Sequence, residues 1–443
     1  MKIAFKTFGC RLNISETESI ISQIENKEDI TKDLKIADII VINTCTVTAE
    51  AEKKCIRLLN QLLAEDKICI STGCFDPTKI IKNDKLIYYS LDNKGDVEVL
   101  IKNIIDYLNQ NKLPIKEFSF KKFSENEKSY RSYQNRFLRP TLDKRFHSRA
   151  FLKIQDGCNN NCAYCKVHIV RGKEQSLDYE KVLDSIEKIY SSGFKEIVLT
   201  GINIAKYNFN NINFTKLLLN LIKLFPNIIF QLSSIEVDNL NEEFFEIIKL
   251  PNIKPYFHLP IQSGSDFILT RMRRKYTIKE YTNAINKIKS SRPDAFLSTD
   301  IIVGFPGENK ETIKQTENIV REIGFHHLHL FPFSKREETD AYNMEETFSN
   351  EEKSFYIERL NNITKGFKNR FINSFIGKQD YIMVEKIERK QNNNDKNNLI
   401  IYGKSYHNLL IKAFYKNNFE VYKGDYLTTY ILGKDKNILI GMV

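Results

Sequence analysis

The sequence of 443 residues contains no apolar run near the roughly 18–20 residues that a membrane-spanning helix requires. Its first residues, Met1 to Lys6, enter a strand-like pattern without the apolar core of a signal peptide. These absences exclude a membrane-spanning protein and favour a cytoplasmic one. Tryptophan is also absent from a chain rich in asparagine, isoleucine and lysine, a composition that biased nucleotide content produces.

The charge is unbalanced, since 67 lysines and arginines against 56 acidic residues give a net charge of +11. An excess of this size favours association with polyanions, although compositional bias explains it equally well. The hydrophobic fraction of 42% and the charged fraction of 28% are typical of a soluble globular protein. The length suggests roughly two to four domains.

Three of the eight cysteines, Cys158, Cys162 and Cys165, lie in eight residues with the spacing C-x3-C-x2-C. A strand-like run, Phe151–Gln155, precedes them, with Gly157 as a pivot. A reducing cytosol argues against disulfides, so clustered cysteines indicate metal or redox chemistry. A closed structural site usually has four protein ligands, whereas three leave one metal position open for a small molecule.

These cysteines have two other interpretations. Free cysteines are often small buried hydrophobic residues, but the intervening asparagines 159–161 make this loop polar. A zinc half-site is the stronger rival, yet no second C-x2-C or H-x3–5-H pair elsewhere would complete it.

The spacing resembles that of the radical S-adenosylmethionine (radical SAM) enzymes. The resemblance implies a [4Fe–4S] cluster whose open iron chelates S-adenosylmethionine, with Tyr164 near the adenine.

Residues 1–110 alternate strands and helices, with strands expected at Lys2–Thr7, Asp38–Asn43 and Lys67–Ser71. The pattern Ser15-x-x-Glu18 predicts a capping box that opens a helix through Ile24, and a second helix is expected over Thr48–Leu63. Each strand is followed by a cysteine, and the carboxyl ends of parallel strands share one sheet edge. The sequence therefore predicts a second three-cysteine site, made of Cys10, Cys45 and Cys74.

The two remaining cysteines have no such position. Cys55 lies within a predicted helix and Cys69 within a predicted strand, so no ligand role is expected for either.

Residues 111–143 lack clean periodicity and are rich in basic and aromatic residues. With the neighbouring Arg145, these are Lys121, Lys122, Tyr130, Arg131, Tyr133, Arg136 and Arg139. Basic residues interleaved with aromatics suit single-stranded RNA, whose bases stack and whose phosphates pair with cations. A charged interdomain linker is the equally weighted alternative.

Residues 144–375 repeat a strand–helix pattern six times. The strands are expected near Phe151, Glu196, Ile228, Pro255, Ala295 and His326, and a long helix over Asn350–Phe375 closes the unit. Six repeats are too few for a closed eight-stranded barrel, so we expect an open partial barrel with its active site at the carboxyl ends of the strands. His326, His327 and His329 could bind a metal, but half-buried structural histidines are the favoured interpretation.

Residues 376–443 change character. Five short strand-like runs in this segment predict a small β-barrel of the OB type, a common nucleic-acid binder.

Over nearly its full length the chain resembles the methylthiotransferases, a radical SAM family with three domains. Gly9-Cys10, Asn43-Thr44-Cys45 and Gly73-Cys74 resemble the auxiliary-cluster domain of that family. The resemblance implies an α/β fold with an N-terminal parallel-sheet domain, a partial (β/α)6 radical SAM barrel and a C-terminal RNA-binding TRAM barrel. It also implies two [4Fe–4S] clusters and S-adenosylmethionine, with the second cluster holding the sulfur. Strand-end position and this resemblance nominate a cofactor pocket of Tyr164, Thr200, Gly201, Ser234, Glu236, Gln262 and Ser263.

Some stretches favour the branch that adds a methylthio group to C2 of N6-threonylcarbamoyladenosine beside the tRNA anticodon. They include Phe8–Asn13, Arg171-Gly172 and Phe331–Ser334 with Arg336. Lys166-Val167-His168 and Phe75-Asp76 depart from the usual family residues without removing a ligand.

Methylthiolation of isopentenyladenosine in tRNA, or of an aspartate of a ribosomal protein, is the first alternative function. A non-enzymatic iron–sulfur or zinc RNA-binding protein is the second. The enzyme would need a tRNA anticodon stem-loop and an electron donor such as flavodoxin or ferredoxin. The sequence names neither the sulfur donor nor any catalytic side chain.

Overall fold

The computed structural model describes residues 1–443 except 25–26, 47, 127–135, 145–146, 390–398 and 416–418. The chain divides into two compact units. Unit 1 comprises Met1–Thr141, Asp156–Asn160 and Cys165–Leu177, and unit 2 comprises Leu142–Gln155, Asn161–Tyr164 and Asp178–Val443. Among the described residues, none of the helices has the length and apolar character that crossing a bilayer demands.

Unit 1 is built on a five-stranded sheet in the order β2-β1-β3-β4-β5, and every pair in it is parallel. Its strands are β1 (Ile3–Thr7), β2 (Ile30–Thr31), β3 (Ile39–Thr44), β4 (Ile68–Gly73) and β5 (Leu86–Tyr89). Its helices are α1 (Arg11–Gln23), α2 (Ala49–Ala64), α3 (Val97–Gln110), α4 (Phe120–Asn126) and α5 (Val167–Arg171), and the short strand β8 (Gln175–Ser176) follows.

Both faces of this sheet are covered, which explains the continuous apolar run of β3. Ile39 and Val41 pack with residues of α1 and α3, whereas Ile40 and Ile42 pack with residues of α2. Successive side chains of a strand point to opposite faces, so a strand between two helical layers needs apolar residues at every position.

One expectation for unit 1 was wrong. Helix α1 begins at Arg11 with Cys10 at the N-cap position, so Ser15 lies inside the helix and its hydroxyl donates to the carbonyl of Leu12 at 2.8 Å. In the segment 111–143, Phe118, Phe120 and Phe123 are buried in one core cluster with residues of α3. Of the basic and aromatic residues expected to contact RNA, Tyr130, Arg131, Tyr133 and Arg145 lie outside the described residues.

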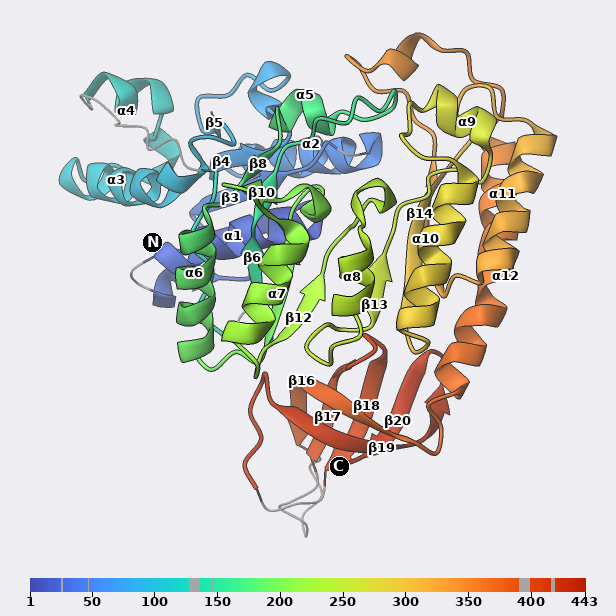
Figure 1. Cartoon of the computed structure of the whole chain (residues 1–443). Helices are drawn as coiled ribbons and strands as arrows, with labels where there is room; N and C mark the ends of the chain where they lie inside the picture. Colours follow the sequence, from blue (N-terminus) through green and yellow to red (C-terminus); the bar gives the residue numbers. More distant parts are fainter. Residues whose placement is uncertain (25–26, 47, 127–135, 145–146, 390–398, 416–418) are drawn as a thin grey trace. The chain divides into compact units, whose positions relative to one another are not determined.

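Unit 2 contains the six predicted strands of the partial barrel, and its helices lie outside them (Figure 1). The strands are β6 (Ala150–Lys153), β9 (Glu196–Thr200), β12 (Ile229–Leu232), β13 (Tyr256–His258), β14 (Phe296–Val303) and β15 (His327–Pro332). The helices are α6 (Tyr179–Ser191), α7 (Phe214–Leu224), α8 (Glu242–Ile247), α9 (Asp266–Arg271), α10 (Ile278–Ser291), α11 (Lys310–Ile323) and α12 (Asn350–Asn373). Short strands β10 (Asn208–Phe209) and β11 (Ile212–Asn213) form a hairpin, and β7 (Gln155–Asp156) follows β6.

The strands form two parallel sheets, β12-β9-β6 and β13-β14-β15. Isolated parallel bridges, Phe230 with Ile253 and Ser234 with His258, join the sheets between β12 and β13. The resulting order follows the chain, as expected for an open six-stranded (β/α) barrel, and it places the strand carboxyl ends along one rim.

The last part of unit 2 is a closed five-stranded barrel in the order β16-β17-β18-β20-β19. Its strands are β16 (Gln379–Arg389), β17 (Leu399–Ser405), β18 (Leu410–Tyr415), β19 (Tyr426–Asp435) and β20 (Ile438–Met442), so the five predicted strands are confirmed. This barrel packs against the amino-terminal ends of the core strands, away from their carboxyl ends (Figure 1).

A buried charge network joins this small barrel to the core. Glu196, at the start of β9, pairs with Lys254 at 2.8 Å and with Arg149 at 3.3 Å, and it accepts a hydrogen bond from Tyr426 of β19. Burial alone raises the pKa of Glu196, but the cations Lys254 and Arg149 lower that pKa to about 2. His407 of the barrel contacts Asp294 of the core and Asp380 of β16, both at 3.1 Å.

Candidate active site

Each sulfur of the C-x3-C-x2-C loop accepts an N–H group. The backbone amide of Asn160 donates to Cys158 Sγ at 3.3 Å, and that of Val167 donates to Cys165 Sγ at 3.4 Å. Thiolates and cluster-bound sulfurs carry negative charge that such donors stabilise. Gly157 has φ +69°, and a side chain there would collide with the backbone of Lys173, so only glycine permits this turn. The donor set therefore fits an iron–sulfur cluster.

The third sulfur, Cys162 Sγ, accepts from the guanidinium of Arg274 at 3.5 Å. Arg274 also pairs with Glu236, and its Nη2 donates to Tyr276 Oη at 3.0 Å. Its Nη1 lies 3.5 Å from Tyr164 Oη as well. The arginine thus places a buried positive charge beside a cysteine and the neighbouring aromatic residue.

The second set of cysteines lies where the topology predicts it. Cys10, Cys45 and Cys74 follow β1, β3 and β4, which are neighbours in the unit 1 sheet. Gly9, with φ +94°, leaves no room for a side chain because a Cβ would collide with Cys45 Sγ. The backbone amide of Cys74 donates to the carbonyl of Thr44 at 3.2 Å. Three thiols from three adjacent strand ends, held closely by a glycine, fit a cluster with one open iron.

Arg171, at the end of α5, is the cation beside this set. Its Nε donates to Cys74 Sγ at 3.2 Å, although the side chain is only 1% exposed. Its Nη1 contacts Glu16 at 3.1 Å and Asp156 at 2.9 Å, while Nη2 contacts Asn13 Oδ1 at 2.9 Å. Burial raises the pKa of the Cys74 thiol, and the nearby Arg171 opposes that shift. Arg171 therefore supplies charge compensation for a sulfur in a low-dielectric environment.

Lys94 completes the buried network from the other side. It pairs with Glu16 and donates to Asn43 Oδ1 at 3.3 Å, and the side chains of Lys94 and Glu16 are each 2% exposed. Two cations and two carboxylates thus lie together beneath the cysteines, an arrangement that tolerates burial because each charge has a partner.

The remaining two cysteines are buried within hydrophobic packing, Cys55 in α2 and Cys69 in β4. Burial raises the pKa of each thiol to about 12, so both stay protonated at neutral pH. A protonated buried thiol is a poor metal ligand.

The nominated cofactor residues occupy different environments. Tyr164 packs edge-on against Phe305, with ring centroids 6.3 Å apart. Glu236 is held in the ion pair with Arg274, and burial raises the pKa of its carboxyl while Arg274 lowers it. Ser234 forms an isolated parallel β-bridge with His258, the last residue of β13. For these three residues a cofactor role stays a prediction.

The other nominated residues have structural explanations. Thr200 is 1% exposed at the end of β9, and a Cβ on Gly201 would lie 2.8 Å from the carbonyl oxygen of Gln155. Gln262 adopts φ +68°, and its backbone bonds to Asp300 and Ile302. Ser263 is fully buried, with its hydroxyl 3.5 Å from that of Thr316 on α11. For these four residues a cofactor role stays a prediction.

The comparisons with known proteins agree with this geometry. Residues 152–320 match the Radical SAM superfamily, and residues 2–87 match a family described as Uncharacterized protein family UPF0004. The Threonylcarbamoyladenosine tRNA methylthiotransferase MtaB of Bacillus subtilis is 34% identical over 371 residues, covering 81% of this chain and 79% of the relative. That of Thermotoga maritima is 31% identical, covering 86% of each chain.

The chain belongs to the radical SAM tRNA methylthiotransferases. A second kind of relative, the tRNA-2-methylthio-N(6)-dimethylallyladenosine synthase of Fusobacterium nucleatum, is also 34% identical and covers 81% of this chain and 82% of the relative. Among solved structures, the radical S-adenosylmethionine methyltransferase TsrM of Kitasatospora setae has a TM-score of 0.52 at 10% identity, covering 77% of each chain. That likeness concerns the fold alone.

Arg274 is the residue of this methylthiotransferase that sequence reasoning missed. The run Arg271-Met272-Arg273-Arg274 follows the Gln262–Ser265 turn, and an arginine cluster soon after residues nominated for the cofactor pocket was the available signal. Packing decides which of these arginines is buried. Arg274 is buried, whereas the neighbouring Arg273 is half-exposed in an ion pair with Asp340.

A buried carboxyl on the turn after β14 gives the methylthiotransferase a pH-dependent stability. Glu308 is fully buried and accepts a hydrogen bond from the Gly304 amide at 2.6 Å. Burial raises the pKa of Glu308 to about 7, against the lowering effect of that hydrogen bond. The folded state therefore binds a proton that the unfolded state, with a pKa of 4.5, has released. Stability from this group is complete below pH 4.5 and is lost as the pH rises through 7.

We expect Glu308→Gln to unfold with the same free energy as the parent chain near pH 4.5 and to be more stable at pH 8. The gain should be about 3 kcal/mol, because each pKa unit corresponds to about 1.4 kcal/mol. Urea unfolding followed by circular dichroism measures it, and Glu187→Gln on the exposed face of α6 is the control. An equal gain at both pH values would contradict the assignment of the proton to Glu308.

Proposed function

We propose that this enzyme adds a methylthio group to C2 of N6-threonylcarbamoyladenosine next to the anticodon of tRNA. The observation that carries the chemistry is the pair of three-cysteine sets, one in the radical SAM loop and one on three adjacent strand ends of unit 1. The choice of nucleoside is supported by the relatives from Bacillus subtilis and Thermotoga maritima, whose names carry it.

The radical SAM set, Cys158, Cys162 and Cys165, would hold one [4Fe–4S] cluster and, through its open iron, S-adenosylmethionine. When bound, these groups supply radical chemistry that can activate a C–H bond which no protein base can ionise. The chain's own part is to hold the charge: two backbone amides and Arg274 donate to the three sulfurs. Tyr164, fixed between Phe305 and Arg274, is the candidate platform for the adenine.

The second set, Cys10, Cys45 and Cys74, would hold a further cluster that carries the sulfur to be transferred. Arg171 contacts Cys74 Sγ directly and is held by Glu16 and Asp156. A buried positive charge therefore lies beside one of the three cysteines that are expected to hold this cluster. A hydrogen bond from a buried arginine to Cys74 Sγ supports a negatively charged sulfur at this position.

Recognition of tRNA is supported by charge and by the small barrel. The net charge of +11 attracts a polyanion, and a closed five-stranded barrel is a frequent nucleic-acid-binding architecture. We assign the RNA-binding TRAM role to β16–β20. The electron donor would be a small redox protein such as flavodoxin or ferredoxin.

The test is an anaerobic assay of the cluster-loaded protein with two anticodon stem-loops, one carrying N6-threonylcarbamoyladenosine and one carrying isopentenyladenosine. Nucleoside mass spectrometry should detect the methylthio product on the first stem-loop and none on the second. Product on the isopentenyl stem-loop alone would overturn the substrate choice and leave the reaction class intact. No product on either, together with no 5′-deoxyadenosine, would favour a non-enzymatic RNA-binding protein.

A further inference from the structure

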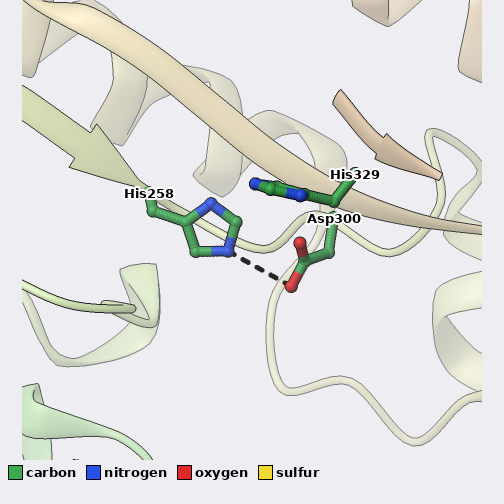
Figure 2. Close-up of side chains that lie close together, drawn as sticks. All are labelled: His258, Asp300 and His329. Atoms are coloured by element: carbon green, nitrogen blue, oxygen red, sulfur yellow. Dashed lines mark ion pairs between the residues drawn. The ribbon is translucent and has the colours of Figure 1, made fainter. Parts of the chain in front are cut away.

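Three polar side chains converge on neighbouring strands of unit 2. Strands β13, β14 and β15 are adjacent and parallel, with His258 in register with Ser298 and Asp300 in register with His329. Register partners point to the same face, and alternate residues of a strand return to it. His258, Asp300 and His329 therefore project to one side of the sheet, as Figure 2 shows.

The distances among these side chains suit ligands of one ion. His258 Nε2 lies 3.2 Å from Asp300 Oδ2, and the ligand atoms of all three residues lie within 4.8 Å of one another. Nitrogen and oxygen ligands bind a divalent transition metal at about 2.0–2.2 Å, so neighbouring ligands of one ion are roughly 3–3.5 Å apart. The first pair already has this separation. His329 is exposed, so its ring can rotate to complete the set.

The contacts of His258 distinguish its two ring nitrogens. Its Nδ1 lies 3.0 Å from Ser298 Oγ, and that hydroxyl also lies 3.2 Å from Tyr256 Oη and 3.4 Å from the carbonyl oxygen of Phe257. The Ser298 hydroxyl therefore holds Nδ1, and Nε2 is the ring nitrogen that faces Asp300. A histidine whose outer nitrogen is held in this way is typical of metal ligands.

We propose that His258, Asp300 and His329 bind a divalent transition-metal ion, of which Zn²⁺ is the representative probe. Two imidazoles and one carboxylate suit such ions and leave a coordination position for water or an anionic oxygen of a ligand. The site is reachable, since the His258 and Asp300 side chains are 12% and 26% exposed. It uses no cysteine, and it does not depend on which nucleoside the enzyme modifies.

The experiment is an anaerobic calorimetric titration of cluster-loaded protein with Zn²⁺. We expect one equivalent to bind to the parent chain with an affinity that His329→Asn weakens at least about 100-fold, because losing even an outer-shell partner costs about 10–100-fold. Ser298→Ala should weaken binding about 10-fold for the same reason. His327→Asn is the matched control, because His327 lies on the same face of β15 two residues before His329 and is not part of the group.

The outcomes separate a defined site from general histidine or thiol binding. Equal losses in His327→Asn and His329→Asn would overturn the proposal, and so would zinc binding that neither histidine variant changes. Cluster absorbance and thermal unfolding must match the parent chain in each variant. His329 is exposed, so its replacement should leave folding intact, and Ser298→Ala provides an independent second variant.

Discussion

A chain carrying Cys10→Ala should lose methylthiolation of tRNA and keep reductive cleavage of S-adenosylmethionine. Cys10 belongs to the unit 1 set, whereas cleavage needs only the radical SAM set. The iron content of reconstituted protein should fall from about eight to about four per chain, at four irons for each cubane cluster. Because Cys10 is exposed, its replacement should cost little folding stability. Iron and sulfide analysis, nucleoside mass spectrometry and detection of 5′-deoxyadenosine measure the three quantities.

Two further variants complete that experiment. Cys158→Ala should lose both activities and also retain about four irons per chain. Cys69→Ala, within β4 and away from the strand end, should keep about eight irons and both activities. Methylthiolation at the parent rate by Cys10→Ala would remove the second cluster from the reaction.

The largest expected loss of stability comes from Arg171→Met. The substitution removes the partner of Glu16 and Asp156, whose side chains are 2% and 1% exposed. Breaking a buried ion pair by removing one member costs about 3–5 kcal/mol, since the remaining charge stays desolvated. Urea unfolding of the cluster-loaded protein, followed by far-ultraviolet circular dichroism because the chain has no tryptophan, measures the change.

Arg273→Met is the matched control for that loss. Arg273 and Asp340 form an ion pair at 2.6 Å, and each side chain is 48% exposed. An exposed pair contributes about 0–1 kcal/mol, so the same substitution should have a small effect there. If Arg171→Met were no more destabilising than Arg273→Met, the network under Cys74 would have no structural role.

The parts of the fold that follow from local patterns were predictable. Apolar runs and turn residues located the six strands of the partial barrel and the five of the small barrel. The convergence of Cys10, Cys45 and Cys74 followed from topology alone, because parallel strands align their carboxyl ends. The capping box at Ser15 was wrong because the pattern S-x-x-E recurs inside helices, and here the N-cap is Cys10.

Long-range partners were not predictable in the same way. Arg171 and Glu16 are 155 residues apart in the sequence, and neither position has a local pattern that names the other. The same holds for Arg274 and Cys162, which are separated by 112 residues. His258, Asp300 and His329 lie on three separate strands, and only their register brings the side chains to one face. Strand registers depend on packing, so periodicity could not supply them.

The network around Glu196 couples sequence changes in the core to sequence changes in the small barrel. Lys254 and Arg149 of the core and Tyr426 of the small barrel all contact this carboxylate. If either part is exchanged, buried polar groups of the other part lose their partners. A chimaera that takes β16–β20 from a relative must import the matching residues of the core as well. The small barrel therefore cannot be exchanged on its own. Its sequence should change together with the sequence of the core residues that it contacts.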